Sequence, residues 1–472
     1  MRSRSSQLRH LDAVLSTDDE QPAQKAALED ATEAGVEIPR EFNAHQYLIF
    51  LLRIAAEIEH CLMVQYLYAG FSLGGPSVGE KLRDKVVLWQ ETVLGIAKEE
   101  MGHLLTVQNL LRCLGGPLNL DREDYPWDSQ FLPFPFRLEP LTRQSLAKYI
   151  VAESPEAWTG REAAAIRAEA ASGLPGGGVK RIGVLYSLIS RLLISTGVKD
   201  SDFREWTHSF QANWDEWGRS YQGGRRGNAT GQQRAGTPNV LISAIVSRTS
   251  AVEAIKALTT QGEANAPDDE GAPSHFARFL DIYRHFPRDH RHAVRDVPVN
   301  PVANEGDDDQ TVISHPLTRL WANLFNVRYR FLLAGLLHSF DFPSNLAAAG
   351  QHTPRGLLIH TTFGEMYHLR ALAQILMRLP LGPDEKRTAG PPFQMPYTVD
   401  LPFDAVDRWR LHLDLIETSR RIVDELLASG AGANQDFLRA LRAADEETAG
   451  LVQRLLLGRQ EPSVTDRLME FH

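Results

Sequence analysis

Glu100 and His103 are the two residues of this sequence whose types and spacing best suit a bound metal ion. Residues three apart are neighbours on a helix, so a Glu and a His at this spacing point the same way. The pair falls on an apolar stripe with helical spacing, formed by Val93, Ile96, Val107 and Leu110. An ionised Glu that faces a core costs free energy of desolvation unless it is paired or bound to metal. The alternative is a surface Glu beside a core histidine satisfied by ordinary hydrogen bonds.

A second acidic ligand is expected on the preceding helical segment. Glu57 and Glu59 lie about 200° apart on a helix and cannot share one face. Glu59 lines up with an apolar row, consisting of Leu52, Ala55, Leu62, Met63 and Tyr66. We therefore choose Glu59 as the ligand and expect Glu57 to form an ion pair with Arg53 or His60. His60 points about a quarter-turn away from Glu59 and could instead hydrogen-bond a ligand.

The elements that must position these residues are helices. Apolar spacing predicts long helices over residues 41–71 and 80–114, joined as an antiparallel hairpin and each closed by glycines. Residues 121–140 are rich in proline and aromatic residues and are expected to form an ordered loop. Further helices are expected at 141–152, in RIGVLYSLI (181–189), at 238–262 and in SHFARF (274–279). No segment alternates like a strand, so the predicted fold class is all-α.

The chain divides into four expected parts. Residues 1–40 form a polar tail, and 41–290 a metal-binding helix bundle with an insertion at about 197–237. Residues 291–400 are expected to pack as further helices, and 401–472 to form a C-terminal helical hairpin with amphipathic surfaces suited to a homodimer.

Composition excludes several classes of function. The 472 residues carry 50 Lys and Arg against 60 Asp and Glu, a net charge of −10, and no basic block, so nucleic-acid binding is not expected. Neither a secretory leader nor a membrane-spanning apolar run is evident, and we expect a cytoplasmic protein without membrane association. With only two cysteines, Cys61 and Cys113, any metal must rest on Glu, Asp, His or Tyr.

Five segments resemble one family, the ferritin-like proteins of the iminophenyl-pyruvate dimer synthase type in bis-indole biosynthesis, within the ferritin-like di-iron superfamily. They span about residues 45 to 395, and the second is the most specific: EIEH (57–60), AKEEMGHLLTVQNLLRCLGGP (97–117), RIGVLYSLI (181–189), QGEA with SHFARF (261–264, 274–279) and AGPPF (389–393). The resemblance implies a ferritin-like bundle in which Glu263 and His275 complete the metal ligands, with Tyr66 and Tyr186 beside them. The last two helices lie outside it.

One position departs from the family pattern. A carboxylate commonly follows Ile-Gly in the third helix, whereas Val184 stands there in this chain. The expected ligands are then Glu59, Glu100, His103, Glu263 and His275, one carboxylate short of the usual di-iron set. This favours one tightly held iron, or a second labile one, and another divalent transition metal is an alternative.

The predicted metal site is compatible with two hypotheses of function. The first is an iron-dependent oxidase or oxygenase that uses O₂ on a small amino-acid-derived molecule, with oxidative coupling implied by the resemblance and a pathway oxidase or reductase as a partner. Trp127, Phe134 and Arg137 in the aromatic loop would line the substrate pocket, and Arg137 or Arg143 would meet a substrate carboxylate. The alternative is a non-catalytic metal-binding or scaffold protein, which Val184 favours.

Other histidines and carboxylates carry weaker signals. Glu365 and His368 repeat the Glu-x-x-His spacing, and His338 lies on the preceding helix, so together they are a candidate second metal site. Equally, each could be a satisfied polar group at the edge of a core. Asp307 to Asp309 and the histidines at 285, 290 and 292 are expected in solvated loops.

Overall fold

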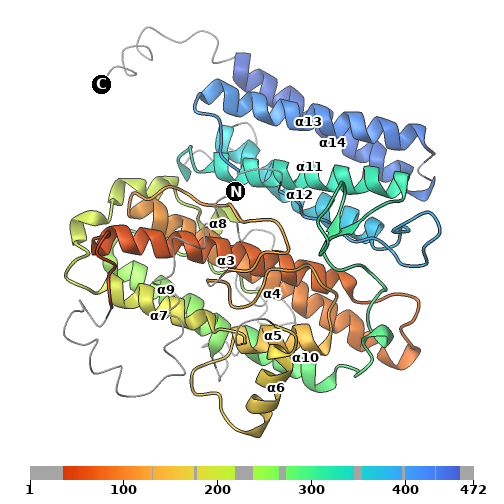
Figure 1. Ribbon diagram of the computed structural model, residues 1–472. Coiled ribbons are helices and arrows are strands. Elements are labelled where there is room, and N and C mark those ends of the chain that lie inside the picture. Colours follow the sequence, from red (N-terminus) through yellow and green to blue (C-terminus); the bar gives the residue numbers. More distant parts are fainter. Residues whose placement is uncertain are drawn as a thin grey trace, which may run out of the picture. The chain divides into compact units, whose positions relative to one another are not determined.

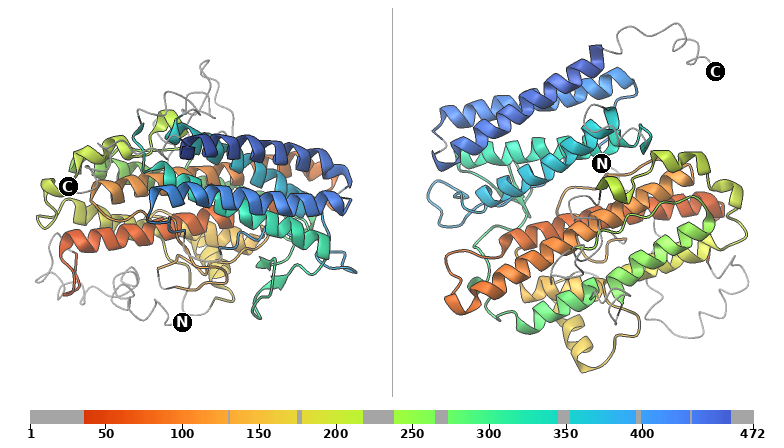
Figure 2. Two further views of the ribbon diagram at one scale, coloured as in Figure 1. Left: turned by 90° about the horizontal axis from the view of Figure 1, so that it is seen from above. Right: turned by 180° about the vertical axis from the view of Figure 1, so that it is seen from behind.

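The computed structural model describes residues 36–129, 131–174, 178–217, 238–264, 273–344, 353–395, 399–430 and 432–457. Helices dominate these residues, which confirms the all-α prediction (Figures 1 and 2). Only two short strands occur among them, β1 (Pro301–Val302) and β2 (Thr311–Val312), and two residues are too few to show alternation. The chain forms two compact units, the first up to residue 300 with 307–311, the second 301–306 with the chain from 312 onward.

The first unit is built around two long helices, α3 (Ala44–Ser72) and α4 (Glu80–Cys113), which lie side by side as the predicted hairpin (Figure 2). Asn43 begins α3 with a capping box, in which its side chain accepts from the Gln46 backbone. The remaining helical elements of this unit are α5 (Arg143–Ala152), α6 (Arg161–Ala171), α7 (Ile182–Leu193), η3 (Asp200–Asp202), η4 (Glu205–Phe210), α8 (Trp214–Trp217), α9 (Arg248–Glu263), α10 (His275–His285) and η6 (His290–His292). Part of the predicted insertion, residues 218–237, lies outside the described residues.

Residues 238–246 were expected to begin a helix, and this prediction is wrong. They form a segment that is neither helix nor strand, here called the strap, and α9 begins only after Ser247, whose side chain caps it. The strap runs along α4, where Thr106 donates to the Leu241 carbonyl and Asn109 to the Ser243 carbonyl. Because these side chains satisfy the strap's backbone, the segment needs no helical hydrogen bonds of its own.

Over its described residues, the second unit contains four long helices and a short turn of helix: α11 (Pro316–Ser339), α12 (Pro354–Leu376), α13 (Ala405–Ala428), η8 (Gly432–Asn434) and α14 (Gln435–Leu457). Buried Arg328 forms ion pairs with Glu365 and Asp445 in its core. His338 faces His412 at 2.9 Å. The candidate second site of Glu365, His368 and His338 is therefore wrong, since Glu365 is neutralised by Arg328 and His338 contacts a different residue.

His412 is expected to make the stability of this unit depend on pH. Its ring is 2% exposed, and burial lowers its pKa to about 4 from 6.5. A lowered histidine pKa contributes stability above pH 6.5 that is lost as the pH falls towards 4, up to about 3 kcal/mol. In urea unfolding, the free energy of unfolding of wild type minus that of His412→Gln should fall by about 2–3 kcal/mol between pH 7.5 and 4.5. An identical pH dependence in both proteins would contradict this assignment.

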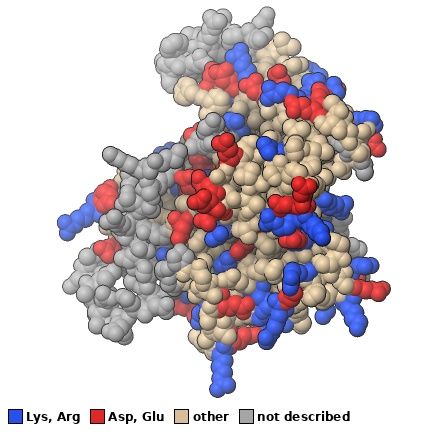
Figure 3. Space-filling model, turned by 45° about the vertical axis from the view of Figure 1, so that its right-hand side comes forward, with Lys and Arg blue, Asp and Glu red and all other residues tan. Residues whose placement is uncertain are grey.

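The surface is of mixed charge where it is seen. On the face in Figure 3, acidic and basic side chains of the described residues are interspersed with uncharged ones. Within the described ranges, no helix is long and apolar enough to cross a bilayer.

Candidate metal centre

Five buried side chains in the first unit form two overlapping groups of possible metal ligands. One group is Glu59, Glu100 and His103, and the other is Glu100, Glu153 and His275. Within each group the ligand atoms lie within 4.8 Å of one another, and every member is at most 4% exposed. Glu100 belongs to both groups, with one oxygen 2.8 Å from His103 and the other 2.9 Å from His275. The structure therefore brings together four of the five predicted ligands and adds Glu153.

The proton on His103 is placed by its neighbours. The Gln261 side chain donates from Nε2 to the Asn239 carbonyl, so its Oε1 is the atom that faces His103 Nε2, at 2.8 Å. An amide oxygen only accepts, which puts a proton on His103 Nε2. His103 Nδ1 is then left facing a Glu100 oxygen at 2.8 Å and a Glu59 oxygen at 3.5 Å.

His275 is oriented in the same way by a carboxylate. Its Nε2 lies 3.0 Å from Glu99, which also accepts from the Arg278 guanidinium and from the Asn239 backbone N–H. Although burial favours the neutral acid, Arg278 and His275 lower the pKa of Glu99 and keep it an anion. His275 Nδ1 is thus directed at Glu100, 2.9 Å away, with Glu153 at 3.9 Å.

Several ligand atoms therefore face each other without a hydrogen bond. Glu59 Oε2, Glu100 Oε1 and His275 Nδ1 are buried and have no hydrogen-bond partner in suitable geometry. Lone pairs at these separations repel unless a proton or a metal ion lies between them. Although burial favours the neutral rings, Glu100 raises the pKa of His103 to about 10 and that of His275 well above 6.5, so a proton on each ring can fill this role when metal is absent. A carboxylate-rich, two-histidine set of this kind fits iron.

Glu153 is the member of these two groups that the sequence analysis missed. It directly follows α5, and it shares one helical face with Leu146, Tyr149 and Ile150, all fully buried. That spacing is the signal that could have revealed it, because an acid on an apolar face is as exceptional here as at Glu100. Glu153 takes the place of Glu263 in the predicted set, so the two groups again hold three carboxylates and two histidines, one carboxylate short of the usual di-iron set.

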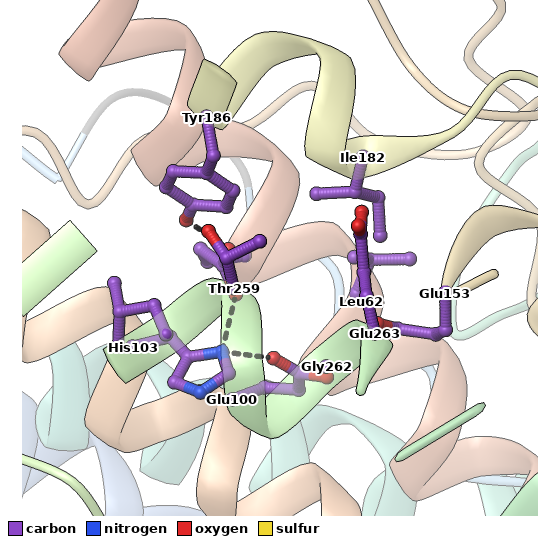
Figure 4. Close-up of a pocket in the computed structure, with 11 residues that line it drawn as sticks. Leu62, Glu100, His103, Glu153, Ile182, Tyr186, Thr259, Gly262 and Glu263 are labelled. Atoms are coloured by element: carbon purple, nitrogen blue, oxygen red, sulfur yellow. Dashed lines mark hydrogen bonds and ion pairs between the residues drawn. The ribbon is translucent and has the colours of Figure 1, made fainter. Parts of the chain in front are cut away.

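Glu263 lies on the wall of the site and is not a member of either group. Its carboxylate is 3.9 Å from Arg181 and lies against Gly183, where an added Cβ would sit 1.7 Å from Glu263 Oε1. Burial, opposed in part by Arg181, raises its pKa to about 7. Figure 4 shows Glu263 and Glu153 on the opposite side of the cavity from His103 and Tyr186.

The predicted neighbours of the ligands divide into two sets. Tyr186 donates to Glu59, and Tyr66 donates to Glu153 at 2.8 Å, so both tyrosines hold a carboxylate of the site. Glu57 instead accepts from Asn119, and His60 Nδ1 faces the Leu120 carbonyl at 2.9 Å. Burial and then the nearby charge of Arg122 lower the His60 pKa well below 6.5, which keeps the ring neutral and argues against an ion pair with Glu57.

The expected substrate-pocket residues do not line the cavity. The Trp127 backbone pairs with Phe136, Phe134 packs near Tyr149, and the Arg137 backbone N–H approaches Gln65. Arg143 stacks on Tyr283, with its guanidinium 3.9 Å from the ring centre. The cavity measures about 20 Å³ and is lined by Glu59, Leu62, Glu100, His103, Glu153, Ile182, Tyr186, Leu258, Thr259, Gly262 and Glu263. That volume holds roughly one water molecule.

Replacing Glu153 or Glu263 by Gln separates the roles of these two acids. Glu153→Gln should weaken metal binding by more than about tenfold, because the residue belongs to a ligand group. Glu263→Gln, on the cavity wall, should change it by less than about threefold. Equilibrium dialysis against Fe(II) under nitrogen would measure both. An equal loss in the two variants would show that Glu263 is also a ligand.

This chain is similar to a family model, to two curated relatives and to a solved structure. A family model described as Ferritin-like matches residues 52–284. Dichlorochromopyrrolate synthase from Lentzea aerocolonigenes is 27% identical over 390 residues, covering 74% of this chain and 36% of that protein. A 2-imino-3-(indol-3-yl)propanoate dimerase from Chromobacterium violaceum is 28% identical over 144 residues, covering 25% of this chain and 14% of that protein. The chain thus spans well under half the length of these relatives.

A solved structure, a ferritin-like protein from Caulobacter vibrioides, is 17% identical, with a TM-score of 0.35 over 69% of this chain and 95% of that one.

Proposed function

Since residues 52–284 form a ferritin-like domain, we propose that this protein is an iron-dependent enzyme of secondary metabolism that oxidatively couples two molecules of an amino-acid-derived imine. The observation that carries the metal site is the set of mutually facing lone pairs on Glu59, Glu100 and His275. The relatives, which are named a synthase and a dimerase, support the coupling of imino acids. Both matches cover a minor part of those proteins, so the substrate is part of the proposal.

The reaction balances with O₂ as the oxidant. Joining two 2-imino acid molecules by a new carbon–carbon bond removes one hydrogen atom from each. The two electrons and two protons pass to O₂, which gives H₂O₂. Iron, held by Glu59, Glu100, His103, Glu153 and His275, would supply the redox chemistry for O₂.

The chain's own residues prepare the site for this chemistry. Tyr186 and Tyr66 each donate to one ligating carboxylate and fix its orientation. Gln261 and Glu99 hold the two imidazole rings. Leu62, Ile182 and Leu258 cover the cavity, which limits access of water to the carboxylates.

The size of the cavity restricts what it receives in this conformation. About 20 Å³ admits a species the size of water, whereas an aromatic imino acid is many times larger. Substrate binding therefore requires side chains of the cavity wall to move, or the imine to react at the rim. Glu263 on the cavity wall and Arg181 beside it are both partly exposed.

The test combines iron content with product analysis. Protein expressed with iron is analysed by elemental mass spectrometry, then incubated in air with an imino acid that a flavin amino-acid oxidase makes from an aromatic amino acid. The expected product has the mass of two imines less two hydrogens, and it requires both iron and Glu100. Exposed Glu91 on the same helix provides the matched control Glu91→Gln.

Two outcomes oppose the proposal. Bound iron without any dimer, across several aromatic imino acids, would favour the metal-binding or scaffold alternative. Dimer formed equally by iron-free protein and by Glu100→Gln would remove iron from the reaction.

A further inference from the structure

The two histidines of the metal centre differ in the group that holds their outer nitrogen. His103 Nε2 faces the neutral amide oxygen of Gln261 at 2.8 Å. His275 Nε2 faces the carboxylate of Glu99 at 3.0 Å. All four side chains are at most 7% exposed, so water screens neither hydrogen bond strongly.

The inner sides of the two positions are closely matched. Each has one histidine Nδ1 and one oxygen of the shared Glu100, at 2.8 Å for His103 and 2.9 Å for His275. Each also has one carboxylate of its own that accepts from a tyrosine: Glu59 from Tyr186, and Glu153 from Tyr66. The outer acceptor of the histidine is therefore the clearest chemical difference between the positions.

The strap fixes this difference through a single residue. The Asn239 backbone N–H donates to Glu99 at 2.6 Å, and the Asn239 carbonyl accepts from Gln261 at 2.7 Å. The Asn239 carbonyl needs a donor, which an amide has and an ionised carboxylate lacks, so a carboxylate cannot take the place of Gln261. Arg278 also contacts Glu99 and balances its negative charge. The group beside His275 Nε2 is still the Glu99 carboxylate.

A carboxylate acceptor makes a metal-bound imidazole a stronger electron donor than an amide acceptor does, because it draws the outer proton more strongly. We propose that Glu99 and Gln261 make the two metal positions unequal, and that the position at His275 binds its ion more tightly than the position at His103. This inference rests on the metal site of the proposed function. Glu99 and Gln261 are positioning residues, since each acts through a histidine.

The test is a titration of the metal-free full chain with Co(II), followed by calorimetry and visible absorption, which need no catalytic turnover. Wild type should bind in two steps whose affinities differ by about tenfold or more. Glu99→Gln replaces the carboxylate beside His275 by a neutral amide, so the tight step should weaken by about 10- to 100-fold and the two steps should converge. Gln261→Met should weaken the other step and move the two further apart.

Two further variants keep the result interpretable. Glu99→Gln leaves buried Arg278 without its carboxylate, so Glu99→Gln/Arg278→Met is measured beside it, and its steps should also converge. Gln108 is a fully buried amide on α4 that bonds to the Asn119 backbone, so Gln108→Met is the matched control for Gln261→Met and should change neither step.

The outcomes separate this inference from the proposed function. Two equal steps in wild type, or equal weakening of both steps by Glu99→Gln and its double variant, would overturn the inference and leave the metal site standing. No binding of Co(II) or Fe(II) by wild type would overturn the metal site itself.

Discussion

Glu100→Gln is expected to abolish metal binding at both positions. Glu100 gives one oxygen to the group around His103 and the other to the group around His275. An amide carries no charge and offers only one acceptor oxygen, so neither group keeps its shared anion. Each binding step should weaken by more than about 100-fold. This exceeds the loss expected when a residue that only holds a ligating histidine, such as Glu99, is replaced. Iron content after purification and Co(II) titration both measure this.

The Glu91→Gln control isolates the cause. Glu91 is exposed on α4, the helix that carries Glu100, so the same chemical change there should leave iron content at the wild-type level. Circular dichroism of both metal-free variants establishes that α4 has formed. Wild-type iron content in Glu100→Gln would mean that the shared carboxylate is not a ligand.

Gly102→Ala is expected to destabilise the protein although it adds only one methyl group. A Cβ on Gly102 would lie 2.6 Å from the Leu241 carbonyl oxygen and 3.0 Å from the Leu241 nitrogen. Both atoms are strap backbone, so the strap must shift, at a cost of about 1–3 kcal/mol. The shift also displaces Asn239, so metal affinity should fall along with stability. Urea unfolding and Co(II) titration of the same preparation measure the two effects.

Gly364→Ala is the matched control for this change. Gly364 lies within α12, and an added Cβ there meets nothing within 4 Å. Alanine is the better helix former, so this variant should gain about 0.5–1 kcal/mol. The two glycine variants should thus move in opposite directions. A Gly102→Ala protein as stable as wild type would show that the strap moves without cost.

Periodicity predicted much of the site because its ligands interrupt apolar stripes. Glu59, Glu100 and His103 stand where a core residue is expected, and the structure places them together in a buried group. His275 followed from the family resemblance, since neither its helix nor the break before it carries a metal signal of its own. Glu153 was missed because its helix is short and it lies just past its end, although the stripe before it is complete.

The strap shows why local pattern was insufficient elsewhere. Its apolar residues suit a helix as well as an extended segment, and side chains of α4 decide between them by binding its backbone. Those bonds join residues more than a hundred positions apart in sequence. The outer partners of the histidines depend on the same long-range packing. No spacing rule within one segment could have predicted Gln261 beside His103.

The distribution of the ligands along the chain has a thermodynamic consequence. Glu59 and His275 are about two hundred residues apart, and between them Glu100 and His103 come from α4 and Glu153 from the end of α5. A bound ion would act as a cross-link that closes these large loops, and an unfolded chain could not present the same set. Metal binding would then be coupled to folding, and each tenfold rise in free metal above its dissociation constant would stabilise the first unit by about 1.4 kcal/mol.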